Sequence, residues 1–212
     1  YFEEYHLSKQ QCELLIKSGW VPHYTIPFEE IEKNREDLSQ FIENYYKNNW
    51  SEIKAIIQNK IELHDIDNEA KTTLLESLEM HEAQFFKAVP RTLFPEIERI
   101  VRDRFRDKYN FFDGIASLQD LRNNLENIGI ADIERDELFA FTLLKMLEDR
   151  FYKRCKSFLV LEQIKKDPIP NRHATIHGYT PYKNFQNSLN AIFIADFIFY
   201  LLPKATAKVA PE

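Results

Sequence analysis

The feature of this sequence that most limits its fold is an apolar run near the end of the chain, Leu189 to Leu202. A helix needs about 20 apolar residues to cross a bilayer, so this run is short for that purpose, and it contains a carboxylate, Asp196. We therefore predict a helix buried in a protein core, with no membrane contact. Its aromatic rings should lie in the core or at a dimer interface, and Asp196 should be a paired or interface carboxylate.

Apolar residues elsewhere in the chain also recur at helical spacing. Four glycines among 212 residues argue against a loop-rich β architecture. We predict an all-α helical bundle with extra N-terminal helices, and residues 157–161 are the one short candidate strand. The helices are expected at 3–18, 28–47, 51–61, 68–88, 96–106, 117–129, 132–152 and 182–202. Gly19 is placed to cap the first helix, Ser51 to begin the third, and Pro95 to stand in a first turn.

Composition sets the class of protein and its surroundings. With 44% hydrophobic and 29% charged residues, the chain is typical of a soluble globular protein. Two distant cysteines, Cys12 and Cys155, indicate a reducing compartment, so we expect a cytoplasmic location. We divide the chain into an N-terminal helical region of unknown role (1–90) and a bundle at 91–205, with one continuous domain as the alternative. The net charge of −6 argues against a broad binder of duplex nucleic acid but allows a local basic patch for a short single strand.

The candidate chemistry lies in residues 171–178, Asn-Arg-His-Ala-Thr-Ile-His-Gly, which prolines flank on both sides. Arg172 and His177 would stand about 140° apart on a helix, so they do not share a face. A long arginine side chain can still swing toward the imidazole, and two copies in a symmetric dimer can converge on one cleft. His173 and His177 are four residues apart and do share a face.

The sequence from Arg172 to His177 resembles the R-x4-6-H motif of HEPN domains, with His173 in the polar position after the arginine. Its place near the end of an all-α chain, just before an apolar helix, fits that family. The resemblance covers roughly residues 168–202. It implies a HEPN-like bundle and a metal-independent endoribonuclease of toxin–antitoxin or phage-defence systems. It also implies an active site built across a homodimer, RNA as substrate, an antitoxin protein as partner, and no cofactor.

The resemblance also implies roles for the three ionisable residues of the motif. His177 would be the general base or acid on a ribose 2′-OH, and Arg172 the clamp that holds the phosphate and stabilises its developing charge. His173 would orient substrate or support His177. The expected product carries a 2′,3′-cyclic phosphate.

Further residues are expected to serve the same site. Asn171, Asn187 and Asn190 are candidates for substrate contact. In the family an acidic or polar residue from an earlier helix often supports the site, and Glu98 and Asp103 are the candidates here.

Other interpretations of the same residues stay open. The motif can belong to a non-catalytic HEPN-like module that dimerises and binds a protein or nucleotide, or its side chains can simply cap helices. A metal site at His173 and His177 is not expected, because no third ligand is evident nearby. Arginines at 99, 102, 104 and 106 alternate with acidic residues, which favours a salt-bridged surface. We find no constellation around the remaining histidines, His6, His23, His64 and His81.

Overall fold

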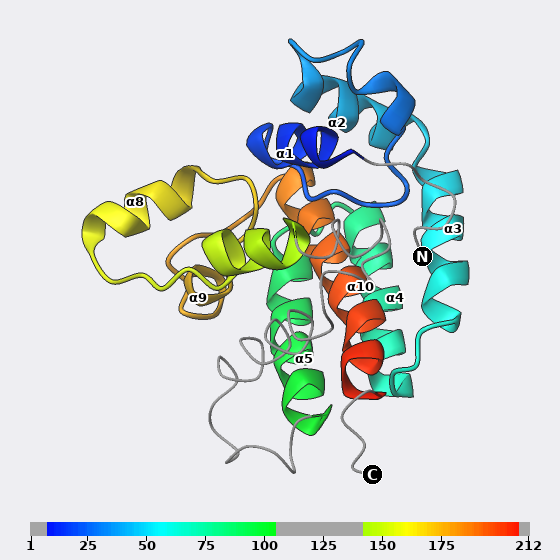
Figure 1. Ribbon diagram of the computed structural model, residues 1–212. Helices are drawn as coiled ribbons and strands as arrows, with labels where there is room; N and C mark the ends of the chain where they lie inside the picture. The colour runs from blue at the N-terminus through cyan, green and yellow to red at the C-terminus, as the bar shows by residue number, and fades with distance from the viewer. Residues whose placement is uncertain (1–7, 105–141, 208–212) are drawn as a thin grey trace, which may run out of the picture.

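The computed structural model describes residues 8–104 and 142–207 (Figure 1). Within these two ranges the chain is all-α and has no strand, as expected. The elements are α1 (Lys9–Lys17), the 3-10 helix η1 (Phe28–Glu30), α2 (Leu38–Asn48), α3 (Trp50–Glu62), α4 (Asn68–Glu82), α5 (Ala88–Arg104), the π-helix η3 (Leu147–Phe151), α8 (Phe158–Lys166), α9 (Arg172–Ile176) and α10 (Phe185–Ala207).

The apolar C-terminal run forms α10, which lies at the centre of the bundle between α4 and α5 (Figure 1). Leu189, Phe193 and Phe197 are buried, so the prediction of a core helix is confirmed. Within the described ranges, α10 is the one helix long and apolar enough to cross a membrane by length and composition. In the apolar stretch Phe185–Pro203, however, 83% of an 18-residue window is buried inside the molecule.

The helices around α10 contribute their apolar faces to one hydrophobic cluster. Three isoleucines of α3, Ile53, Ile57 and Ile61, recur every four residues and are buried, as helical periodicity requires. The cluster takes residues from both sides of position 90, including Trp20 and Phe94. The division of the chain into two parts at that position stays a prediction.

Several helix boundaries differ from the expected ones. The predicted helix at 28–47 is broken, because only η1 and α2 are helical and turns connect them. Ser51 lies inside α3, which begins one residue earlier at Trp50. The short candidate strand at 157–161 is helical instead, because the Ser157 hydroxyl accepts a hydrogen bond from the Val160 backbone N–H (3.3 Å) and caps the start of α8.

The turn between α4 and α5 is also earlier than expected. α4 ends at Glu82, and the Phe85 N–H donates to the Met80 carbonyl (2.8 Å) across Gln84, whose φ is +62°. This is a Schellman ending with glutamine at the position that usually holds glycine. α5 then begins at Ala88 and contains Pro95 in its interior, so the prediction that Pro95 stands in a first turn was wrong.

The predicted helix at 132–152 is described from residue 142 onward. Residues 142–146 are helical, and η3 follows, where the Tyr152 N–H donates to the Leu147 carbonyl (2.8 Å). Leu143, Met146 and Phe151 are buried, as the periodicity indicated. The predicted helix at 117–129 lies outside the described residues.

Candidate functional site

The Arg/His motif folds as one short helix, α9, between two capping residues. The Asn171 side chain accepts a hydrogen bond from the Ala174 N–H (2.9 Å) and so caps the N-terminus. At the other end the Tyr179 N–H donates to the Ala174 carbonyl (2.8 Å), and Gly178 has a φ of +71°. Arg172 is therefore the first residue of the helix, and His177 is the last residue before the glycine turn.

Buried hydrogen bonds hold α9 in place. The Asn171 amide nitrogen donates to the carbonyls of Arg150 (2.7 Å) and Lys153 (2.9 Å). The Tyr182 hydroxyl accepts from the Asn171 N–H (3.0 Å) and donates to the Ile164 carbonyl in α8 (3.3 Å). A helix of five residues is unstable alone, so these bonds are what fix the motif in one geometry.

Arg172 forms an ion pair with Glu98 of α5, through the guanidinium Nε and the carboxylate Oε1. The two side chains are 25% and 21% exposed, so the pair is partly shielded from water. Burial lowers the pKa of Arg172 from its ordinary value. The other acidic candidate, Asp103, instead contacts Arg99 (Nη1 to Oδ2, 3.1 Å). Of the two predicted acidic supports, the structure brings Glu98 to the motif.

The two histidines of α9 lie side by side, with ring centroids 4.4 Å apart. The Tyr179 ring stacks on His177 at 5.7 Å. His177 is exposed and His173 is partly buried. Burial lowers the pKa of His173, and the charges of His177, Arg172 and Arg154 lower it further. His173 is therefore neutral at pH 7.

The three asparagines that we expected to contact substrate are buried and bonded to the protein's own backbone. Asn171 caps α9, as described above. The Asn190 Oδ1 accepts from the Val21 N–H (2.9 Å), and the Asn187 Nδ2 donates to the Pro168 carbonyl (2.8 Å). The amides of Asn190 and Asn187 thus tie the loop after α1 and the loop before α9 to α10.

A second ionisable cluster surrounds Asp196 in the middle of α10. His23 Nε2 contacts Asp196 Oδ2 (3.1 Å), and His64 Nε2 contacts Asp196 Oδ1 (2.7 Å). The prediction of a paired Asp196 is confirmed, and the prediction that His23 and His64 lack a constellation was wrong. Burial alone would raise the pKa of Asp196, but the hydrogen bonds and charges of the two imidazoles hold it well below its ordinary value.

The cluster continues away from Asp196 through two hydroxyl groups. The Thr25 N–H points at His23 Nδ1 (3.4 Å), so that nitrogen accepts and Nε2 carries the proton that faces the carboxylate. Thr25 Oγ1 lies 2.8 Å from His23 Nδ1 and 2.9 Å from the Tyr46 hydroxyl. All of these side chains are buried, so the cluster stabilises the core and does not meet a substrate. Because 173 and 132 residues separate the two histidines from Asp196, no local pattern could reveal the pairing.

His81 makes a third buried pair, with Ser188 of α10. The His81 Nδ1 lies 2.8 Å from the Ser188 Oγ, and the rings of Trp50 and Phe185 pack against the imidazole at 4.5 and 4.7 Å. Burial lowers the pKa of His81 to about 3. Serine and histidine at this spacing can form a nucleophile and its base, but both are closed to solvent here. The pair is therefore structural.

Metal ligands do not cluster in the described part of the chain. No group of three or more His, Cys, Asp or Glu side chains there could hold a metal ion. The two cysteines are free thiols, Cys12 buried and Cys155 partly buried.

Comparisons of the chain with protein-family models, with curated proteins and with solved structures found no match. The protein is therefore an all-helical chain without a family assignment. The resemblance to HEPN domains rests on Arg172, His177 and their place before the central helix.

Proposed function

We propose that this protein is a metal-independent endoribonuclease that cleaves RNA at the α9 cluster. One observation carries the proposal: the solvent-exposed imidazole of His177 lies beside a second imidazole, next to an arginine whose guanidinium is held by Glu98. Imidazole and guanidinium are the groups that transfer protons near neutral pH and bind phosphate. Capping and buried hydrogen bonds already hold them in one geometry.

The chemistry that these groups support is an internal phosphoryl transfer. His177 takes the proton from a ribose 2′-OH, and the 2′ oxygen attacks the adjacent phosphorus. The bond from phosphorus to the 5′ oxygen breaks, and that oxygen takes a proton from the imidazolium. The products are a 2′,3′-cyclic phosphate and a free 5′-OH. His173, whose ring lies 4.4 Å from that of His177, supports it from the side.

Arg172 is suited to hold the phosphate during this step. A guanidinium has five N–H donors, so an ion pair at Nε leaves others for phosphate oxygens. Glu98 fixes the arginine in place before substrate arrives, which lowers the reorganisation that the reaction requires. A lysine at this position would keep the charge but lose the planar geometry.

The local charge favours an anionic substrate even though the protein carries a net charge of −6. The charges of Arg172 and Arg154 act on His173, so two guanidinium groups lie near the imidazoles. A small basic patch of this kind suits a short single strand better than a long duplex. The proposal extends to a cytoplasmic homodimer in which two copies of α9 form one cleft, with an antitoxin protein as its regulator.

A second candidate is a non-catalytic module that dimerises and binds a protein or nucleotide through the same surface. The motif's contacts inside the protein favour this alternative, because Arg172 already pairs with Glu98 and Asn171 caps α9. Under this alternative, the motif holds α9 in place and carries out no reaction.

Cleavage of labelled RNA in EDTA by His177→Gln distinguishes the two candidates. Loss of general acid–base catalysis should lower the rate by about 10²-fold or more. Ile176→Ala, an exposed change on the same helix, is the matched control and should keep the wild-type rate. Arg172→Lys should also be slow, because the bidentate geometry is lost. Folded, dimeric wild-type protein that cuts no RNA would contradict the enzyme and favour the binding module.

A further inference from the structure

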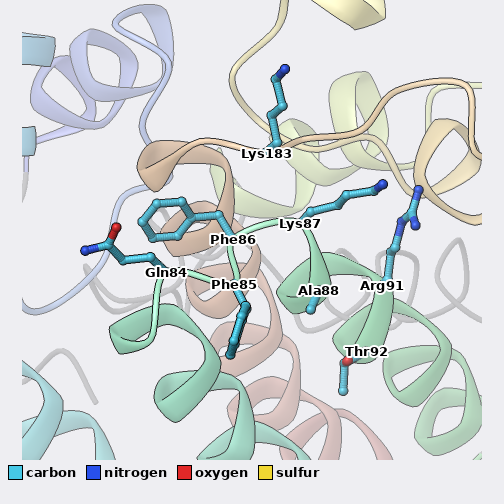
Figure 2. Close-up of a pocket in the computed structure, with 8 residues that line it drawn as sticks. All are labelled: Gln84, Phe85, Phe86, Lys87, Ala88, Arg91, Thr92 and Lys183. Carbon is cyan, nitrogen blue, oxygen red and sulfur yellow. The ribbon is translucent and has the colours of Figure 1, made fainter.

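A pocket of about 650 Å³ opens between the α4–α5 turn and the loop that precedes α10 (Figure 2). Lys87 and Arg91 extend to one side of it, and Lys183 lines it from the loop above, with its amine pointing away from the turn. Phe86 and Phe85 lie on the other side, one above and one below the turn. The pocket thus combines three cationic side chains with two aromatic rings.

The three cations of this pocket are not neutralised by the described part of the chain. None of the described residues that line the pocket is acidic, and none of the three takes part in an ion pair recorded for those residues. Lys54, by contrast, forms ion pairs with Glu79 and Glu82. Three like charges on one pocket of an acidic protein disfavour one another, and a bound anion would relieve that repulsion.

The aromatic rings add a second kind of contact. Phe86 is partly buried, with its ring against those of Phe185 (6.0 Å) and His81 (5.3 Å). Phe85 is 65% exposed and is free to stack on a planar ligand. Proteins that bind single-stranded nucleic acid combine a basic groove with aromatic rings on which bases stack. The pocket has both parts.

Two segments of the chain, α5 and the connection from α9 to α10, contribute residues both to the pocket and to the surroundings of the α9 cluster. Arg91 and Glu98 are seven residues apart on α5, which places them on one face about 10 Å apart. Lys183 belongs to the segment that connects α9 to α10. A strand whose phosphate contacts Arg172 can therefore extend along α5 into the pocket.

We propose that this pocket binds a nucleotide that flanks the cleavage site of single-stranded RNA. Lys87, Arg91 and Lys183 contact its phosphates, and Phe85 stacks on its base. The inference rests on the proposed ribonuclease function, because it takes RNA as the ligand. It adds a substrate-binding surface outside the Arg/His motif.

Binding of a labelled 2′-O-methyl RNA oligonucleotide, which cannot be cleaved, tests the pocket directly by fluorescence anisotropy. The double variant Arg91→Gln/Lys183→Gln should weaken binding. It should also reduce the slope of log K against log salt by about 1.4, since each phosphate contact on a single strand contributes about 0.7. Lys17→Gln/Lys145→Gln removes the same charge from exposed positions away from the pocket and should leave the slope unchanged.

Phe85→Ala should weaken binding about fivefold or more through lost stacking, without changing the salt slope. AMP serves as a second ligand, and its binding should be far weaker than that of the oligonucleotide. Equal binding of AMP and the oligonucleotide would overturn the assignment to RNA. Wild-type affinity and slope in both pocket variants would overturn the pocket itself.

Cleavage of unmodified RNA separates the two proposals. If the wild type cuts RNA and the pocket variants cut and bind as well as it does, the pocket proposal fails and the ribonuclease proposal stands. If the oligonucleotide binds through the pocket and the wild type cuts nothing, the pocket stands as an RNA site and the catalytic proposal fails.

Discussion

The buried imidazole of His81 makes the stability of this protein sensitive to mild acid. His81 is 2% exposed, and burial lowers its pKa to about 3 from an ordinary value of 6.5. In the unfolded chain the imidazole binds a proton below about pH 6.5, whereas in the folded protein it does so only near pH 3. The stabilisation is therefore complete above pH 6.5 and decreases as the pH falls toward 3.

The size of this effect follows from proton linkage. For each additional proton that the unfolded state binds, the free energy of unfolding falls by about 1.36 kcal/mol for every unit by which the pH decreases. Between pH 7 and pH 5, His81 alone should lower the free energy of unfolding by about 2 kcal/mol. His23, whose pKa burial also lowers, acts in the same direction over the pH range below 6.5.

Urea unfolding at pH 7, 6 and 5 measures this dependence. His81→Asn keeps a polar atom near Ser188 but removes the titrating group. Between pH 7 and pH 5, its free energy of unfolding should therefore decrease by about 2 kcal/mol less than that of the wild type. Ile176→Ala, an exposed change at a residue without a titrating side chain, should keep the wild-type dependence. An identical pH dependence in His81→Asn and the wild type would show that His81 does not cause the loss of stability in acid.

Three further predictions concern single positions. Gln84→Gly should raise the free energy of unfolding by about 0.5–1 kcal/mol in urea titrations, because the residue has a φ of +62°. Gly178→Ala should cost about 1 kcal/mol from its φ of +71° alone, and Gly19→Ala should cost more, because a Cβ there would lie 2.2 Å from Pro168 Cγ. Equal losses of stability at the two glycines would show that Pro168 moves away from the added Cβ at position 19 without cost. Asp196→Asn should lower stability by about 3–5 kcal/mol, since it removes the charge that two buried imidazoles share, and a loss under 1 kcal/mol in thermal and urea unfolding would contradict that role.

The part of the fold that sequence could predict is the part set by local pattern. The apolar run of α10 indicated a buried helix, and Asp196 within it indicated a paired carboxylate. Gly19 ends α1 with a φ of +86°, as its position suggested. In each case the signal lies within a few residues of the feature that it predicts.

The errors arose where tertiary packing overrides local preference. A proline inside a helix costs about 3 kcal/mol, which suggested that Pro95 begins one. In the structure α5 begins earlier, and the buried side chains of Leu93, Phe94 and Ile97 on both sides of Pro95 stabilise the helix through it. Ser157 begins a helix although apolar residues that favour strands follow it.

The candidate site shows the same limit. Sequence spacing placed Arg172, His173 and His177 together, and the structure has them on one short helix. The engagement of Asn190 with Val21 depends on a contact across 169 residues, which no local pattern shows. Glu98 was one of two acidic candidates, and only the packing of α9 on α5 distinguishes it from the other.

The end groups of the cleaved RNA report directly on which oxygen attacks the phosphorus. Purified protein in EDTA should release fragments that carry a 2′,3′-cyclic phosphate and a free 5′-OH, and an RNA with a 2′-deoxy sugar at the cleavage site should stay intact. This result is expected if His177 takes the proton from the 2′-OH, because the 2′ oxygen is then the nucleophile. Fragments with a 5′-phosphate, or cleavage that requires a divalent metal, would contradict the mechanism built on Arg172 and His177.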